Sequence, residues 1–182
     1  MSEQIFSKAG PLMQRAQSGR VLLSQLSTPE QFLISALRLW NQGRHEQGPC
    51  CCRSLLRNGF QAADLSQAAF EHFDSSLSAI AATQIESASW IAAPRQAALT
   101  PSEHRIVRIV AHCQRDDVAT ALGALRNWLP PTTARVVLTS IYAFAQAFAN
   151  AGLILRGDAH AAPTTTTRDS IIPLRPRSIR LH

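Results

Sequence analysis

Residues 28–31 read Thr-Pro-Glu-Gln and residues 100–103 read Thr-Pro-Ser-Glu, and each stretch has the chemistry of a helix start. Threonine is a good N-cap residue, proline is tolerated at the first helical position, and glutamine or glutamate three residues after the cap can complete a capping box. Apolar residues follow each start at steps of three and four, as on one face of a helix. We therefore predict a helix after each of these two caps.

The same reasoning along the rest of the chain predicts an all-α fold of about six helices. Their expected ranges are 28–41, 49–57, 66–82, 101–113, from 116 or 117 to 129, and from 132 or 133 to 151. Gly43, Gly59, the Pro130-Pro131 pair and Gly152 are the expected stops. Residues 84–99 are expected to form an ordered connector. The predicted buried stripes are Leu33, Ala36, Leu37 and Trp40; Phe70, Phe73, Leu77 and Ile80; Val118, Leu122, Leu125 and Leu129; and Val137, Ile141, Phe144 and Phe148.

The domain organisation follows from where this pattern ends. Residues 1–156 are predicted to form a single helical domain, and residues 157–182, with their threonine run and prolines, a disordered basic tail. Segments 28–83 and 100–152 share a plan of helix, polar break, helix and long aromatic-bearing helix. One interpretation is a duplicated three-helix unit packed as a helical hairpin stack, and the other is the ordinary rhythm of any helical protein.

Composition indicates a globular protein with a basic balance. There are 18 basic and 12 acidic residues among 182, and 46% of the residues are hydrophobic. Lys8 is the only lysine, so the preference for arginine extends over the whole chain and is not a local cluster of the kind that marks a nucleic-acid footprint. The N-terminal residues do not have the pattern of a secretory signal. We expect a cytoplasmic protein.

The sequence offers no complete catalytic or metal-binding motif, so we expect neither an enzyme nor a cofactor or bound metal. Cys50, Cys51 and Cys52 are adjacent, and on a helix their side chains diverge too far to share one tetrahedral ion. His45, His104, His112 and Cys113 have no ligand spacing that demands a metal. The uncharged stretch 136–155 is long enough to cross a bilayer, but its polar residues favour a buried core helix, so no membrane span is expected.

Two resemblances come from the second half of the chain. Residues 99–103, Val107 and Ala111, then residues 117–123, then Thr133 and Ile141 resemble the helix-turn-helix domain of LuxR-type regulators over 99–145. That resemblance implies DNA binding with Arg135 on the recognition helix, and the nucleic-acid contacts would then be Arg135, Arg175, Arg177 and Arg180. The paired prolines and the helix ending at 151–153 also resemble short bacterial helical proteins of no assigned function.

Our leading hypothesis is a protein–protein interaction module, an adaptor or chaperone-like accessory factor without a catalytic site. The predicted recognition helix offers only Arg135 as a charged reader, whereas a helix in the major groove needs several donors. A protein partner or a homo-oligomer is expected, and the candidate partner surface is Trp40, Trp90 and Trp128. The alternatives are a helix-turn-helix transcriptional regulator and a redox or metal sensor built on Cys50, Cys51 and Cys52.

Overall fold

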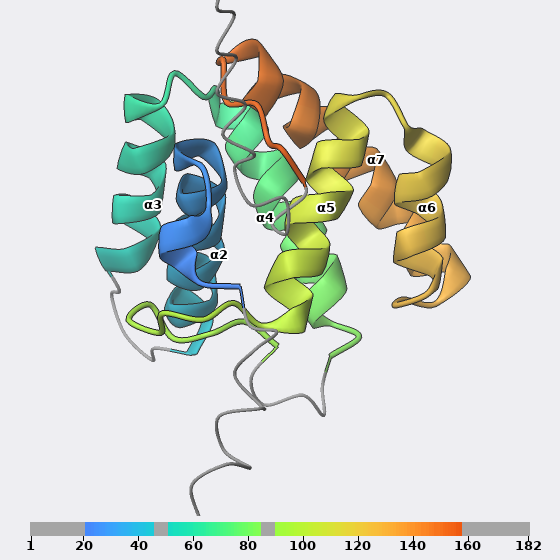
Figure 1. Cartoon of the computed structure of the whole chain (residues 1–182), viewed down its shortest axis with the longest axis horizontal. Coiled ribbons are helices and arrows are strands. Elements are labelled where there is room, and N and C mark those ends of the chain that lie inside the picture. Colours follow the sequence, from blue (N-terminus) through green and yellow to red (C-terminus); the bar gives the residue numbers. More distant parts are fainter. Residues whose placement is uncertain (1–20, 46–50, 85–89, 158–182) are drawn as a thin grey trace, which may run out of the picture.

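A computed structural model describes residues 21–45, 51–84 and 90–157 of the chain. These residues form six α-helices and one short 3-10 helix, which confirms the predicted all-α fold (Figure 1). Their bounds are η1 Leu23–Gln25, α2 Thr28–His45, α3 Cys51–Ala62, α4 Gln67–Ala81, α5 Pro101–Gln114, α6 Val118–Arg126 and α7 Pro131–Asn150. Most of the predicted tail, from residue 158 onward, lies outside the described residues.

The helices pack around one core in which α4 and α7 form the most extensive pair. The pair α2 and α3 covers one side of them, and α5 and α6 cover the other (Figure 1). Phenylalanine rings join these layers. The ring centroid of Phe73 on α4 lies 5.3 Å from that of Phe144 on α7, and also 5.3 Å from that of Phe60 on α3. The two long helices therefore meet through their aromatic stripes. The division into two units, 28–83 and 100–152, stays a prediction.

Three of the four predicted stripes are buried as expected, on α2, α4 and α7. The prediction of the buried stripe on α6 was partly wrong. Leu125 and Leu129 are buried, but Val118 is 37% exposed, and Ala121 takes a buried place that the pattern did not assign. Because Val118 stands in the first turn of α6, it lies at the edge of the core, whereas the small Ala121 allows α6 to approach its neighbours closely.

The two helix starts differ from one another in detail. Thr100 caps α5 and forms a capping box with Glu103, as predicted. Thr28, in contrast, is already the first residue of α2. The N–H and O–H of Ser27 both donate to Oε2 of Glu30, at 2.9 and 2.8 Å, so the contact that opens α2 lies one residue earlier than the predicted box of Thr28 and Gln31. Proline is therefore the second residue of α2, as Pro29, but the first residue of α5, as Pro101.

The predicted stops at Gly43 and Gly59 were wrong, because both glycines lie inside helices. A Cβ on Gly43 would stand 3.4 Å from the Cβ of Cys52, so this glycine lies at the contact of α2 with α3. Helix α3 ends instead near Asp64, which takes a left-handed backbone with φ of 55° while the Leu65 N–H donates to the Phe60 carbonyl. Gly152, with φ of 77°, ends α7 as predicted.

The described part of the connector, residues 90–99, is ordered, as expected. It pairs with the chain just before η1, where the Leu23 N–H donates to the Ala97 carbonyl and the Leu99 N–H donates to the Val21 carbonyl. Among the described residues, no helix has the length and apolar character needed to span a bilayer. Helix α7, which contains most of the uncharged stretch, packs against α4, α5 and α6.

Candidate functional site

Of the three tryptophans predicted as a partner surface, two are buried and one is half-buried. Trp40 and Trp90 are 6% and 9% exposed and pack edge to face with ring centroids 6.3 Å apart. Trp90 in turn lies 6.2 Å from Trp128, which is half-buried. The three rings form a row that runs from the core outward. Packing of each ring on its neighbour stabilises the fold. Of the three, Trp128 alone reaches the surface substantially.

The residues predicted for nucleic-acid contact are only partly described. Arg135 is exposed on α7 beside Val136, which is 62% exposed, while Arg175, Arg177 and Arg180 lie outside the described residues. The opposite face of α7 is fully buried, with Ala134, Val137, Ile141, Phe144, Ala145 and Phe148. Helix α7 therefore packs into the core over most of its length, and its one cationic side chain, Arg135, lies near its start.

The cysteines differ widely in environment. Cys51 is exposed, Cys52 and Cys113 are buried, and Cys50 lies outside the described residues. Burial raises the pKa of the Cys113 thiol to about 12, with a smaller contribution from the charge of Asp117. Such a thiol stays protonated near neutral pH and is a poor nucleophile. No three ligand-type side chains gather around a common point in the described part of the chain.

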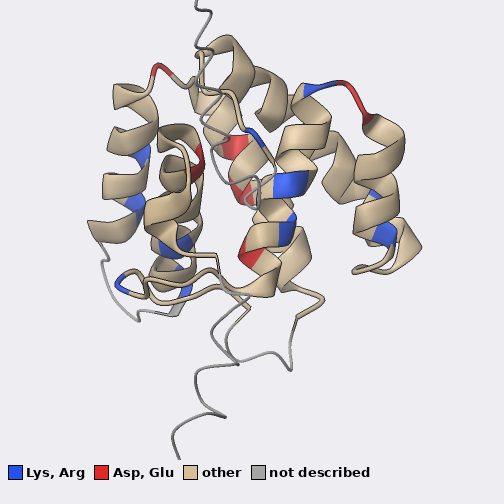
Figure 2. Ribbon diagram, in the orientation of Figure 1, with Lys and Arg blue, Asp and Glu red and all other residues tan. Residues whose placement is uncertain are grey.

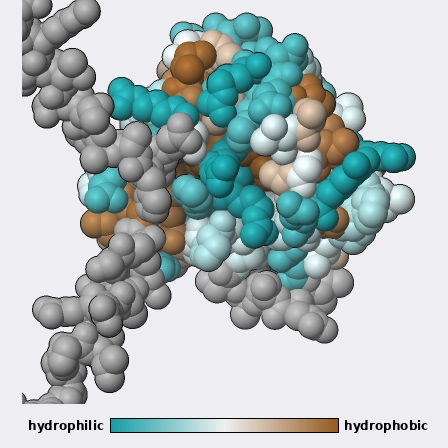
Figure 3. Space-filling model, turned by 45° about the vertical axis from the view of Figure 1, so that its right-hand side comes forward, coloured by the Kyte–Doolittle hydropathy of each residue, from teal (hydrophilic) through white to brown (hydrophobic). Residues whose placement is uncertain are grey.

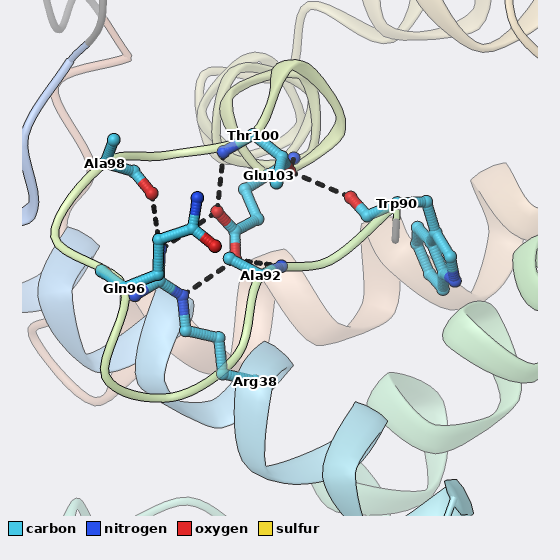
Figure 4. Close-up of polar contacts among 7 residues, drawn as sticks. All are labelled: Arg38, Trp90, Ala92, Gln96, Ala98, Thr100 and Glu103. Atoms are coloured by element: carbon cyan, nitrogen blue, oxygen red, sulfur yellow. Dashed lines mark hydrogen bonds and ion pairs between the residues drawn. The ribbon is translucent and has the colours of Figure 1, made fainter. Parts of the chain in front are cut away.

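The most deeply buried charges form an ion pair between Arg38 of α2 and Glu103 of α5 (Figure 4). Glu103 also accepts the N–H groups of Ala92, at 3.1 Å, and of Thr100, at 2.8 Å. Arg38 donates further to the carbonyls of Gln96 and Ala98. All these partners belong to the chain itself, so the network fixes the connector onto α2 and α5 and has no polar atom left for a substrate.

A second buried carboxylate ties the two ends of the described fold together. Oε1 of Glu30 accepts the N–H groups of Arg156, at 3.2 Å, and of Gly157, at 3.1 Å. Gln114 holds the same segment through its amide, which donates to the Leu153 carbonyl and accepts the Leu155 N–H. Residues 153–157 are thus fixed across α5 by side chains, and this cluster is structural as well.

A small cleft of about 70 Å³ opens between α2, α3 and α4 beside Trp40 and Phe70. Its acidic wall is Asp74, which accepts the indole N–H of Trp40 at 2.7 Å and pairs with Arg53 at 3.3 Å. The guanidinium of Arg44 stacks 5.0 Å from the Trp40 ring. The polar groups of this cleft are already matched with one another, and its volume is well below the roughly 300 Å³ of an ordinary small-molecule site.

A larger concave surface is a groove of about 670 Å³ between α5 and α6. We call it the α5–α6 groove. One wall is a cationic stripe on α5, and the other is a polar or small-residue stripe on α6. The lining residues are Pro101, His104, Arg105, Arg108 and His112 from α5, with Thr120, Gly123, Ala124 and Asn127 from α6. Figure 2 shows basic positions on consecutive turns of α5, and Figure 3 shows hydrophilic side chains running down this side of the molecule.

The electrostatics of the α5–α6 groove favour anions, since none of the described residues that line it is acidic. Arg105 lies with its guanidinium 5.1 Å from the Trp128 ring, which holds this charge at one end of the groove. At the other end, Nδ1 of His112 lies 3.0 Å from Oδ2 of Asp117. The other oxygen of Asp117 caps α6 by accepting the Thr120 N–H, so this carboxylate is committed to the protein.

Sequence reasoning missed Arg105 and Arg108 as candidate site residues. Their signal was present, because Pro101, Arg105, Arg108 and His112 recur at steps of four, three and four, which places them on one face of a helix. An exposed charged face is the normal state of an amphipathic helix, so spacing alone gives such a stripe no special meaning. The structure adds the groove that the stripe borders. Comparisons with protein-family models, with curated proteins and with solved structures found no match for this chain.

Proposed function

We propose that this protein is a helical interaction module that binds an acidic segment of a protein partner in the α5–α6 groove. The observation that carries the proposal is the groove itself, a concave surface with Arg105 and Arg108 on one wall and no acidic lining residue. Binding in such a groove needs charge complementarity, which fixes register and accelerates encounter. No catalytic group is assigned in this proposal, and the role fits an adaptor or accessory factor of the cytoplasm.

A protein partner is favoured over duplex DNA by the layout of the cations. The cations of the groove wall stand in one short row on α5, whereas α7, which corresponds to the recognition helix in the LuxR-type resemblance, offers Arg135 beside the apolar Val136. Base readout in the major groove requires several donors on one inserted element. The exposed face of α7 does not supply them, and the α5–α6 groove lies between two other helices.

The test compares an acidic peptide with duplex DNA on the whole chain. Poly-glutamate and a DNA duplex are titrated over a salt series against wild type, the double variant Arg105→Ala/Arg108→Ala, and a charge-matched control, Arg57→Ala/Arg95→Ala. The control arginines are exposed and lie away from the groove. We expect the groove variant to bind poly-glutamate at least about tenfold more weakly, since a charged hydrogen bond contributes roughly 1.5–3 kcal/mol.

Three results would overturn the proposal. The first is the absence of poly-glutamate binding by wild type, and the second is an equal loss of binding in the control. The third is DNA binding that survives about 150 mM salt with a steep salt dependence and exceeds the binding of poly-glutamate, because that behaviour indicates a nucleic-acid protein.

A further inference from the structure

The two walls of the α5–α6 groove follow straight helices and carry side chains of different size. On α5 the lining residues Pro101, Arg105, Arg108 and His112 span eleven helical steps, which is about 17 Å. On α6 the lining residues are Thr120, Gly123, Ala124 and Asn127, at steps of three, one and three. Small residues of this kind leave room for the backbone of a third element to come close.

From this geometry we propose that the occupant of the groove is an acidic amphipathic α-helix, with carboxylates on the α5 side and small side chains on the α6 side. This inference rests on the proposed function and specifies the shape of the partner. The Cβ atoms of residues three or four apart on one face of a helix lie about 6 Å from one another, so Arg105 and Arg108 on α5 have the same backbone spacing as carboxylates at positions i and i+4 of a docked helix.

A helix suits these walls better than an extended strand does. A strand that docks by its backbone needs an open sheet edge with unpaired N–H and carbonyl groups. The walls here are α-helices whose backbone groups in the middle turns are bonded within each helix. An extended segment could therefore pair its backbone groups only with side chains of the walls or with water, whereas a docked helix satisfies them internally.

Gly123 provides a direct test of the close approach on the α6 side. A Cβ built at Gly123 meets no heavy atom within 4 Å, so a side chain added there starts in open space on the groove wall. Gly59 of α3 is a matched control, since it is also a helical glycine with open space at its Cβ, and it does not line the groove. Gly123→Leu should obstruct a docked helix, and Gly59→Leu should not.

The experiment uses the full chain and three synthetic peptides of about 20 residues, a length at which an isolated helix can form. The first peptide places its glutamates on one helical face with alanines beside them. The second has the same composition with the glutamates dispersed around the helix. The third is the first with two central prolines, which break the helix. Affinity is measured by calorimetry, and the backbone chemical shifts of labelled peptide report its conformation.

We expect the first peptide to bind as a helix and at least about tenfold more tightly than the other two, a difference of about 1.4 kcal/mol. Gly123→Leu should remove that advantage, and Gly59→Leu should retain it. Equal binding of the three peptides, an extended bound conformation, or an unchanged affinity in Gly123→Leu would each overturn the inference while leaving acidic-segment binding intact. Failure of poly-glutamate to bind would remove the proposed function itself.

Discussion

The guanidinium of Arg38 and the carboxylate of Glu103 form a two-pronged ion pair with no access to solvent. Nε of Arg38 lies 2.8 Å from Oε1, Nη2 lies 3.1 Å from Oε2, and the two side chains are 1% and 0% exposed. The two residues are 65 positions apart in the chain, and they hold the connector through three of its backbone groups, with the N–H of Thr100 as a fourth partner. The pair therefore joins α2, α5 and the connector into one unit.

The first prediction concerns this pair. Arg38→Met keeps a long apolar stem but removes the charge, which leaves the buried Glu103 carboxylate without its counterion. Breaking a buried pair from one side costs about 3–5 kcal/mol. The control is Arg95→Met, an exposed arginine of the same connector, which should change stability by less than about 0.5 kcal/mol. Urea unfolding measures the free energy of unfolding of both variants. A loss below about 3 kcal/mol in Arg38→Met would contradict the prediction and would show that the fold accommodates Glu103 without its counterion.

The burial of Arg38 shows where sequence reasoning reached its limit. The periodicity of residues 28–41 predicted a helix with Leu33, Leu37 and Trp40 inward, and the structure confirms that stripe. An arginine beside such a stripe normally reaches water with its charged end. Arg38 instead meets a carboxylate that belongs to a distant helix. Nothing local indicates that pairing, because it exists only once α2 and α5 have packed.

The predicted helix ends at two glycines were also overruled by contacts between helices. Gly43 and Gly59 are strong local stop signals, yet each costs only about 1 kcal/mol inside a helix. Burial of Phe60 directly after Gly59 outweighs that penalty, and Gly43 lies where α2 contacts Cys52 of α3. Gly152 kept its predicted role because its left-handed backbone suits glycine. Helix existence was therefore predictable, whereas two ends and the α5–α6 groove depended on tertiary packing.

The second prediction contrasts two glycines with left-handed backbones. Gly152 has φ of 77° and open space at its Cβ, whereas Gly157 has φ of 74° and would place a Cβ 2.9 Å from that of Ala111. Gly152→Ala should therefore cost only the left-handed penalty of about 1–2 kcal/mol. Gly157→Ala adds overpacking of about 1–3 kcal/mol and displaces the N–H that donates to Glu30. Thermal unfolding compares the stabilities of the two variants. Equal losses of stability would mean that residues 153–157 can move to accommodate the added Cβ at no cost in free energy.

The third prediction concerns thiol reactivity. Because burial raises the pKa of Cys113 to about 12, this thiol should react with iodoacetamide at pH 8 far more slowly than the exposed Cys51. Mass spectrometry of proteolytic peptides distinguishes the two sites over time. Addition of urea beyond the unfolding midpoint should equalise their rates, which serves as the internal control. Rapid labelling of Cys113 in native protein would show that α5 opens locally at that position.

The fourth prediction concerns acid sensitivity at the start of α6. Hydrogen bonds from the side chain and then the backbone of Thr120, followed by a weaker contribution from His112, hold the pKa of Asp117 below its usual 3.8. A carboxyl whose folded pKa is depressed stabilises the fold fully above its unfolded pKa, and loses that contribution as the pH falls through the folded value. The loss of this contribution of Asp117 to the free energy of unfolding should therefore be confined to pH below about 3.8.

Asp117→Asn separates the charge of this group from its capping role, because asparagine is an equally good N-cap and cannot ionise. The variant should fold normally at pH 7, and its unfolding free energy should fall less steeply than that of wild type below pH 3.8. Carboxyl NMR titration gives a second measurement, in which Thr120→Ala should raise the pKa of Asp117 toward 3.8, since it removes the first cause of the shift. An unchanged titration in Thr120→Ala would assign the lowering to the groups that the variant retains, which are the backbone N–H of residue 120 and then His112, whose Nδ1 lies 3.0 Å from the same carboxylate.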